Sequence, residues 1–402
     1  MISDNNIRKY LKLINSLGLS SSDRIIESSP TTLIVKIKNQ SLVNFSSNNY
    51  LGVSDDDRVK HAVKKALNIY GLGSGGSRLM TGNSKVQLEL EDKIARFKGY
   101  PSAITFATGY MANLGVVKSI VRPVKLDFMS SGTRREDGVV FSDSLNHASI
   151  VEGVKLAGCE KHVYEHLDSD DLEKKMTLSN LKRKLIITES IYSMDGDIVD
   201  LSKIIGVAKK FNSMLMVDDA HGTGVLGISG RGIVEYSECA KEDIDILMGT
   251  FTKAFGGFGG FIVGSDQMIN YIRYSANSYI FTAPIPPVIA SGLIASIDIV
   301  INEPERIKKL WDNIYYFKKL LTEANINFLN STSQIVPIFI GDEKKTVKTA
   351  RRLLEDGYFT SPVIWPAVKK SEARLRVTIT SMHEYSHLES FVYALDKNMK
   401  VK

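Results

Sequence analysis

A lysine stands between two hydroxyl residues and a glycine pair in residues 248–257, MGTFTKAFGG. The apolar run at 244–248, IDILM, has the composition of a buried strand, and such a strand would deliver Lys253 to a turn. A lysine amine that is partly removed from water can become nucleophilic enough to form a Schiff base. On this stretch alone, a solvated loop lysine is the more ordinary interpretation.

A second stretch, MLMVDDAHGTG at residues 214–224, favours the catalytic interpretation. Asp218 precedes Lys253 by 253 − 218 = 35 residues, and one strand–helix–strand unit takes about 30 or more. The two strands can therefore end at the same edge of a parallel sheet, where Asp218, His221 and Lys253 would converge. Pyridoxal phosphate requires such groups, an amine to hold its aldehyde and an acid to keep its ring nitrogen protonated.

Composition excludes several other classes of protein. The chain has 402 residues, 43% of them hydrophobic, and its net charge of +6 is spread over 51 basic and 45 acidic residues. These values are typical of a globular protein of two domains, and the sequence has no cluster of basic residues that would indicate nucleic-acid binding. No apolar run approaches the roughly 20 residues of a membrane span. Cys159 and Cys239 lack metal-ligand spacing, and we expect a cytoplasmic protein with no metal site.

Alternating strand-like and helix-like segments predict an α/β fold with a mostly parallel sheet. We expect an N-terminal arm and helix at 1–58, a large cofactor-binding domain at 59–290 and a small C-terminal α+β domain at 291–402, because a proline-rich break at 280–287 ends the alternation. The Gly-rich loop at 71–78 is either a connector or a ligand-facing loop, in which Arg78 could reach an anion. Residues 129–137 form a polar loop with no assigned chemistry.

Two further strand ends carry candidate groups. Residues 101–113, PSAITFATGYMAN, predict a strand, a turn and a helix start, where backbone N–H groups at Gly109 and Tyr110 would cradle a phosphate. His147 follows the predicted strand 139–143, at the carboxyl end where open α/β sheets bind ligands. The acids after strand 185–189 lack His or Cys at ligand spacing, which argues against a metal site.

The motifs SDSLNHAS (142–149), DDAHGTG (218–224) and GTFTKA (249–254) together resemble the α-oxoamine synthases. The resemblance runs from Asn44 to about His383. It implies the pyridoxal-phosphate-dependent fold type I of aspartate aminotransferase and a homodimer with its active site shared between subunits. It also implies a reaction in which an amino acid condenses with an acyl thioester, loses carbon dioxide and leaves an α-amino ketone.

The resemblance also implies roles for individual residues. Lys253 would hold the cofactor and then remove the α-proton, Asp218 would pair with the ring nitrogen, and His147 would stack on the ring. His221 and Ser193 match positions that contact the phenolic oxygen. Phosphate contacts are implied for Gly109, Tyr110 and Thr250, and for Thr282 of the other subunit. Arg376 matches the arginine that binds the substrate carboxylate, and Asn48 lies in a substrate-side motif.

The substrates stay open among several members of the family. Residues 75–83, GGSRLMTGN, look most like 8-amino-7-oxononanoate synthases, which join alanine to a pimeloyl thioester, and Arg24 is the nearby candidate for a pimeloyl carboxylate. Residues 279–284, YIFTAP, are similar to serine palmitoyltransferases. A pathway-specific synthase stays open too, as does the thioester carrier, coenzyme A or acyl carrier protein. An aminotransferase would share Lys253 and Asp218 but use no thioester, and a non-catalytic subunit would lack the lysine.

Overall fold

A computed structural model describes residues 4–16, 25–123 and 138–400. The chain divides into two compact units: a small unit of residues 1–52, 194–196 and 309–402, and a large unit of residues 53–193 and 197–308. The division at 308/309 lies beyond the expected boundary at 290/291, which falls inside helix α11 (Pro287–Asn302). Arg24 and the loop at 129–137 lie outside the described residues.

The described part of the large unit contains a seven-stranded sheet in the order β3-β9-β8-β7-β6-β4-β5. Strand β9 is antiparallel to both of its neighbours, and every other pairing from β8 to β5 is parallel. The expected mostly parallel α/β sheet is thereby confirmed. Its strands are β3 (Ser102–Phe106), β4 (Val139–Asp143), β5 (Glu160–Tyr164), β6 (Lys184–Glu189), β7 (Met214–Asp218), β8 (Ile246–Thr250) and β9 (Gly260–Gly264).

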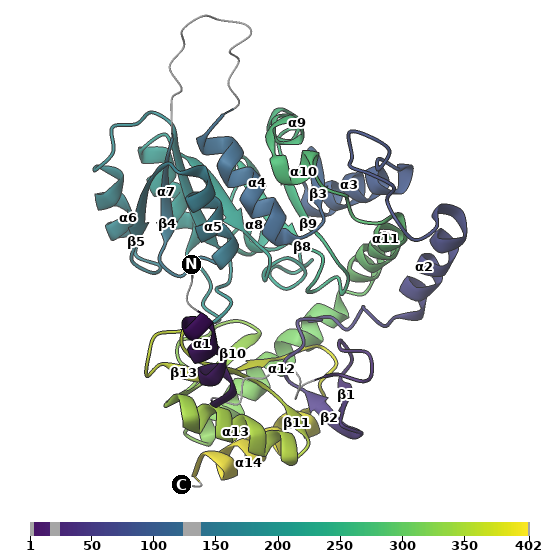
Figure 1. Ribbon diagram of the computed structural model, residues 1–402, viewed down its shortest axis with the longest axis vertical. Helices are drawn as coiled ribbons and strands as arrows, with labels where there is room; N and C mark the ends of the chain where they lie inside the picture. Colours follow the sequence, from purple (N-terminus) through teal and green to yellow (C-terminus); the bar gives the residue numbers. More distant parts are fainter. Residues whose placement is uncertain (1–3, 17–24, 124–137, 401–402) are drawn as a thin grey trace, which may run out of the picture. The chain divides into compact units, whose positions relative to one another are not determined.

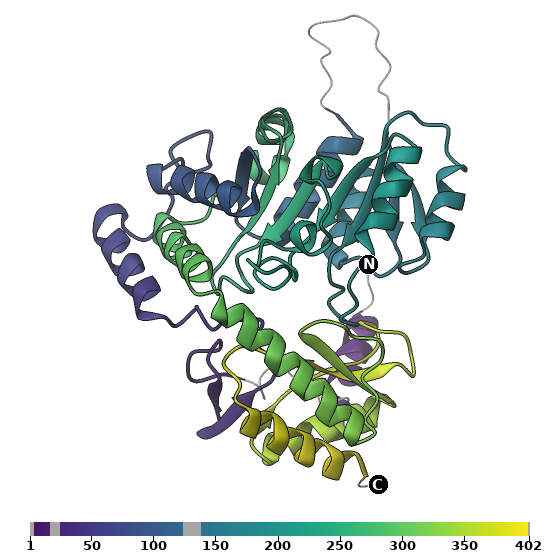
Figure 2. The same ribbon diagram turned by 180° about the vertical axis from the view of Figure 1, so that it is seen from behind.

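Helices cover both faces of this sheet (Figures 1 and 2). Helices α4 (Gly109–Val121) and α5 (Ala148–Ala157) pack side by side on one face, and α6 (Ser169–Met176) and α7 (Leu201–Lys210) lie on the other. This division follows from right-handed crossovers, because the strand order advances from β3 to β4 to β5 and then reverses to β6 and β7. The reversal point opens a crevice at the carboxyl ends of the strands.

Burial explains why the central strands are apolar throughout. β4, β8 and β9 are buried at every residue. One core cluster joins apolar side chains of α4 and α5 with four from these strands, Val140, Ile246, Met248 and Ile262. Strands covered on both faces are expected to be continuously hydrophobic rather than alternating. The polar residues therefore come where each strand ends, and those positions supply the candidate site.

The remaining helices of the large unit follow the sequence signals closely. α3 ends before Gly99, which has the left-handed φ of 76° that favours glycine at a helix C-terminus. α11 begins directly after the proline-rich break and packs on α2 and α3. These helices are α2 (Asp57–Tyr70), α3 (Lys85–Lys98), α8 (Ile233–Tyr236), η2 (Lys241–Asp243), α9 (Asp266–Ser275) and α10 (Asn277–Ile280).

The small unit contains two three-stranded sheets, β1-β2-β11 and β10-β13-β12, among its described residues. Its strands are β1 (Ile34–Ile37), β2 (Gln40–Asn44), β10 (Ile335–Gly341), β11 (Tyr358–Phe359), β12 (Ser361–Val363) and β13 (Ala373–Thr378). Its helices include α1 (Asp4–Ser16), α13 (Glu343–Glu355) and α14 (Tyr385–Lys400), and α12 (Glu305–Glu323) begins just before it. Within the described ranges no single helix is long and apolar enough to cross a membrane, although α11 and α12 pass that test as a bent pair.

Candidate active site

A pocket of about 240 Å³ lies at the carboxyl ends of the central strands of the large unit. Its lining comes from β6, β7 and β8 and from the starts of α4 and α5. The lining residues are Thr108, Gly109, Tyr110, Asn113, His147, Ser149, Glu189, Asp218, Ala220, His221, Met248, Thr250, Thr252 and Lys253. The structure therefore brings together Lys253, Asp218, His221, His147, Thr250, Gly109 and Tyr110, as the sequence predicts.

Lys253 lies in the turn between β8 and β9, and its side chain is half-buried. The turn is closed by hydrogen bonds from the backbone N–H of Gly256 to the carbonyl of Lys253, at 2.9 Å, and of Gly257 to the carbonyl of Phe251, at 2.8 Å. Gly256 has a φ of 62° and its α-carbon faces the backbone of Ser54, so a side chain there would be strained and crowded. The glycine pair after the lysine thus fixes the turn that presents the amine to the pocket.

Asp218 is the last residue of β7, and only 5% of its surface is exposed. Its Oδ1 accepts a hydrogen bond from the backbone N–H of Ala220 at 3.0 Å, and its Oδ2 accepts one from Nδ2 of Asn113 at 2.8 Å. Two donors stabilise a buried carboxylate in its charged form. Such an anion can hold a proton on a ring nitrogen placed against it.

His147 is the residue that precedes α5, and its Nδ1 accepts a hydrogen bond from the backbone N–H of Ser149 at 3.2 Å. Its ring is exposed at the pocket, with the edge of Tyr110 at a centroid distance of 6.5 Å. Partial desolvation lowers the pKa of His147, Asp218 opposes that change, and the positive charge of Lys253 adds to it. The imidazole therefore favours its neutral form.

Glu189, the last residue of β6, is a pocket residue that sequence reasoning did not assign. Burial raises the pKa of its carboxyl well above the ordinary value, and the nearby charge of Asp218 raises it further. A carboxyl oxygen accepts a hydrogen bond from the backbone N–H of His147. The sequence signal that could have identified Glu189 is its position at the carboxyl end of a predicted strand. Asn113 could have been identified in a similar way, because it lies one turn into the helix that follows β3.

The start of α4, where the sequence predicts a phosphate cradle, lies at the pocket. Thr108 caps the helix, accepting a hydrogen bond from the backbone N–H of Met111 at 3.1 Å, and Gly109 and Tyr110 follow in the first turn. A β-carbon at Gly109 would lie 2.6 Å from Cε of Met248, so glycine keeps the backbone open beside the pocket. The unpaired N–H groups and the dipole of a helix start favour an anion.

These groups together fit pyridoxal phosphate. An amide cradle suits its phosphate, the buried carboxylate of Asp218 suits its ring nitrogen and the amine of Lys253 suits its aldehyde. This fit rests on three kinds of chemical group that lie at one pocket. The required lysine, acid and anion site are all present there.

Two predicted cofactor contacts are not among the residues that line this pocket, namely Ser193 and Thr282. Ser193 comes directly before residues 194–196, which belong to the small unit. Thr282 follows α10, and its Oγ1 lies 3.5 Å from the carbonyl of Ala283. Both assignments stay predictions, and that of Thr282 concerns the other subunit.

The two predicted substrate residues lie together within the small unit. Nη1 of Arg376 on β13 donates a hydrogen bond to Oδ1 of Asn48 at 3.2 Å and another to Oγ1 of Thr378 at 3.3 Å. Arg374, two residues earlier, is 4% exposed and pairs with Asp195 at 2.5 Å. Arg374 and Arg376 share one face of β13, but Arg374 is buried in its ion pair whereas Arg376 is only partly buried.

Two other pairs of charged groups serve the structure. Arg78, which the sequence suggested as an anion ligand, is instead buried in a two-pronged ion pair with Glu91, at 2.9 and 3.0 Å. Asp197 accepts from Nε2 of His166 at 3.3 Å. Within the described residues, no group of three or more His, Cys, Asp or Glu could hold a metal ion.

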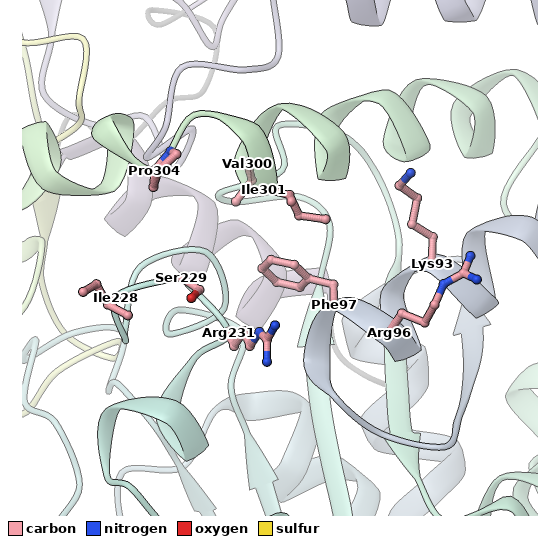
Figure 3. A pocket seen from close by; sticks show the side chains of 9 residues that line it. All are labelled: Lys93, Arg96, Phe97, Ile228, Ser229, Arg231, Val300, Ile301 and Pro304. Atoms are coloured by element: carbon pink, nitrogen blue, oxygen red, sulfur yellow. The ribbon is translucent and has the colours of Figure 1, made fainter.

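A second pocket of the large unit, of about 630 Å³, is larger but lacks this chemistry (Figure 3). Its lining combines apolar residues of α3 and α11 with Lys93, Arg96 and Arg231. Lys93 pairs with Asp298 at 2.5 Å, and Arg96 pairs with Asp92. The amine of Lys93 is already held in an ion pair, and the residues that line this pocket include no carboxylate that could face the ring nitrogen of the cofactor. The smaller pocket is therefore the candidate active site.

The fold and the pocket define an enzyme scaffold of the fold type I class, and comparison with known proteins agrees. Residues 40–395 match the family described as aminotransferase class I and II. The 8-amino-7-oxononanoate synthase of Petrotoga mobilis is 37% identical over 98% of this chain and 97% of its own length. A solved structure of serine palmitoyltransferase with PLP aligns with a TM-score of 0.89 at 28% identity, covering 98% of this chain and 96% of the other.

A third relative, 4-hydroxy-2,2'-bipyrrole-5-methanol synthase PigH of Serratia sp. (strain ATCC 39006), is 41% identical over 87% of this chain. The chain spans about half of that protein, 52% of its length. The chain belongs to the class I and II aminotransferase family and, within it, to the α-oxoamine synthases.

Proposed function

We propose that the protein binds pyridoxal phosphate and condenses an amino acid with an acyl thioester, releasing carbon dioxide and an α-amino ketone. The observation that carries this proposal is the convergence of Lys253, Asp218 and His147 on one pocket beside the start of α4. The 37% identity to an 8-amino-7-oxononanoate synthase over nearly the full length of both chains supports the reaction class.

The residues divide the chemical work among them. When bound, pyridoxal phosphate supplies an aldehyde that captures an amine and a ring that withdraws electrons from the neighbouring carbon. Asp218 would hold the proton on the ring nitrogen, and its two donors fix the position of its carboxylate. Lys253 would hold the cofactor through its amine, and the same amine, when free, would remove the proton from the α-carbon of the amino acid. Gly109, Tyr110 and Thr250 orient the phosphate, and His221 supports the phenolic oxygen.

Substrate binding is proposed for Arg376 and Asn48 of the small unit. A guanidinium can bind the carboxylate of the amino acid with two parallel hydrogen bonds, which fixes its orientation as well as its position. Asn48 supports this role because it already accepts a hydrogen bond from Nη1 of Arg376 at 3.2 Å. The proposed task of Ser193 is a contact to the phenolic oxygen.

The proposed substrates are alanine and a pimeloyl thioester, with coenzyme A or acyl carrier protein as the carrier. This choice is supported by two 8-amino-7-oxononanoate synthases that are similar to this chain over nearly their whole length. A pathway-specific synthase is the second candidate, because the relative with 41% identity is named a 4-hydroxy-2,2'-bipyrrole-5-methanol synthase. Serine with a long-chain donor is the third, supported by the fold match to serine palmitoyltransferase.

We also propose a homodimer in the cytoplasm, with Thr282 completing the site of the other subunit. Three apolar side chains near the Gly-rich loop and Thr282 are strongly exposed in the single chain: Leu72 at 78%, Met80 at 78% and Phe281 at 79%. Ser74 in that loop donates a hydrogen bond to the carbonyl of Pro284 at 3.0 Å, which ties the loop to the segment after Thr282. A cluster of exposed apolar side chains is typical of a subunit interface.

The test is a spectral titration of the purified protein with glycine, alanine and serine, followed by acyl thioesters of graded length. We expect the visible absorbance of the bound cofactor to change with alanine, and thiol and carbon dioxide to appear once a pimeloyl thioester is added. A response only to serine and long-chain donors would select the sphingolipid-like reaction. Spectral change with amino acids but no thiol release from any donor would favour aminotransfer.

Lys253→Ala is the matched variant for this experiment. We expect the variant to fold but to lose the visible absorbance of the covalently held cofactor and all turnover. Turnover that persists in Lys253→Ala would contradict the proposed reaction.

A further inference from the structure

A continuous chain of hydrogen bonds joins His147 to Asp218 through two buried side chains. Nδ2 of Asn113 donates to Oδ2 of Asp218 at 2.8 Å and to Oγ of Ser149 at 2.9 Å. Oγ of Ser149 lies 2.7 Å from Nδ1 of His147. Asn113 and Ser149 are each only 1% exposed, so water does not substitute for any of these contacts.

The direction of the chain is fixed at the Asp218 end. An ionised carboxylate offers only acceptors, so Asn113 must turn its NH₂ group toward Oδ2 of Asp218. The opposite placement of the amide would set its oxygen against a carboxylate oxygen. In the observed orientation Oδ1 of Asn113 is buried with no hydrogen-bond partner among the described residues, a cost that the two donated bonds offset. One of those two bonds necessarily goes to Ser149.

The direction is fixed independently at the His147 end. The backbone N–H of Ser149 donates to Nδ1 of His147 at 3.2 Å, and a backbone amide cannot reverse its polarity. Nδ1 must therefore carry a lone pair rather than a hydrogen. The hydroxyl of Ser149, which accepts from Asn113, gives its own hydrogen to the same nitrogen. The two ends agree on one arrangement of protons.

We propose that Asn113 and Ser149 are positioning residues that hold His147 as the neutral tautomer with its only ring proton on Nε2. Both donors at Nδ1 stabilise the neutral ring and oppose the imidazolium, which would need a hydrogen there. This tautomer does not follow from the presence of a histidine at the pocket. It follows from the buried amide and hydroxyl behind that histidine.

Several charged groups face His147 from the neighbouring elements. Asp218 on β7 favours its protonation and Lys253 opposes it. Glu189 on β6 accepts from its backbone N–H, and the phenol of Tyr110 on α4 is bonded to Glu152 of α5. The donors at Nδ1 must therefore counter the attraction of Asp218, which favours the charged ring.

A neutral His147 has a consequence for the proposed function. A positive charge on His147 would partly offset the negative charge of Asp218, with which it interacts directly. Keeping the imidazole neutral leaves that charge to hold the proton on the ring nitrogen of pyridoxal phosphate. This consequence rests on the proposed function, whereas the tautomer itself rests only on the hydrogen bonds.

The tautomer can be measured by ¹⁵N NMR of protein labelled at its seven histidines, with and without added pyridoxal phosphate. The His147→Asn variant assigns the signals of His147. We expect an unprotonated Nδ1 and a protonated Nε2 at pH 7 in both samples. A hydrogen on Nδ1 at pH 7, in either tautomer or in the imidazolium, would overturn the inference. The result does not depend on turnover, so an inactive protein with the expected tautomer supports the inference and removes only the proposed reaction.

Three serine variants test the role of the hydroxyl through a pH titration of the same signals. In Ser149→Ala, Nδ1 loses one of its two donors, and we expect the pKa of His147 to rise by about one unit. Ser149→Thr retains a hydroxyl and is expected to restore the original titration. Ser144→Ala removes an exposed hydroxyl from the same turn and serves as the matched control. An unchanged pKa of His147 in Ser149→Ala would overturn the proposed role of Ser149.

Discussion

The amine of Lys98 lies 2.7 Å from Oδ2 of Asp219, and the side chains of both residues are fully buried. Lys98 also donates to Oγ1 of Thr223 at 3.1 Å and to the carbonyl of Arg231. Oδ1 of Asp219 accepts from the backbone N–H of Ile233 at 3.3 Å. One ion pair thus holds both ends of the segment that follows Asp218 and contains His221.

Removing the charge of Lys98 should destabilise the protein strongly. In Lys98→Met the carboxylate of Asp219 stays buried without its cation, and we expect a loss of about 3–5 kcal/mol in the free energy of unfolding. Lys98→Met combined with Asp219→Asn removes both charges and should recover part of that loss. Urea denaturation measures both values.

A lysine at the start of the same helix gives the matched control. The side chain of Lys85 is 84% exposed, and Lys85→Met should change the free energy of unfolding by no more than about 0.5 kcal/mol. Equal effects of the two substitutions would show that the buried pair contributes nothing beyond a surface charge.

His166 should make stability depend on pH in the alkaline range. Burial alone would lower its pKa, but hydrogen bonds to Asp143 at 3.0 Å and Asp197 at 3.3 Å outweigh burial and raise the pKa to about 9. The folded pKa lies above the unfolded value of about 6.5. The stabilisation is therefore fully present below pH 6.5 and is lost as the pH rises through 9.

The difference in unfolding free energy between the wild type and His166→Asn isolates this effect from other groups that titrate in alkali. We expect the difference to be about 1 kcal/mol near pH 6, as for a partly exposed ion pair, and to approach its minimum above pH 10. A difference that grows with pH would mean that His166 folds in its neutral form.

Much of the candidate site could be predicted because its residues stand where apolar strands end. Asp218 ends such a strand, Lys253 and His147 each follow one, and parallel strands bring their carboxyl ends to one edge. The chain order of strands and helices likewise fixed the class of sheet. A local sequence pattern was sufficient to predict a residue's position wherever that position depends only on the strand or helix in which the residue lies.

The remainder depends on pairings that local pattern does not contain. Arg78 sits in a glycine-rich loop typical of anion sites, yet Glu91 on the following helix buries it as an ion pair. The hydrogen-bond chain from His147 to Asp218 needs Asn113 from α4 and Ser149 from α5, side chains 36 residues apart. The domain boundary expected at 290/291 falls inside α11, because the proline-rich break starts that helix.

Two glycines that touch each other should respond differently to alanine. A β-carbon at Gly260 would lie 2.5 Å from Cα and 2.6 Å from N of Gly109, which sets backbone against backbone. A β-carbon at Gly109 meets mainly the flexible end of Met248, at 2.6 Å from its Cε. We expect Gly260→Ala to cost roughly 1–3 kcal/mol and Gly109→Ala less than about 1 kcal/mol.

Gly260→Ala should also displace the start of α4, so we expect weaker retention of pyridoxal phosphate during dialysis as well as lower stability. Fluorescence of released cofactor and urea denaturation give the two readouts. If Gly260→Ala keeps the stability of the wild type and retains pyridoxal phosphate normally, then β9 and α4 accommodate the added methyl group without moving the start of α4.

Arginines two residues apart on β13 provide the last pair. If Arg376 binds the substrate carboxylate, Arg376→Lys replaces a planar fork with a point charge, and the KM for the amino acid should rise roughly tenfold. Arg374→Lys is the matched control, because Arg374 is 4% exposed and its partner is Asp195. We expect that control to lower the melting temperature while the KM stays unchanged. Steady-state kinetics at saturating thioester separate the two, and a KM that rises only in Arg374→Lys would transfer the carboxylate contact to Arg374.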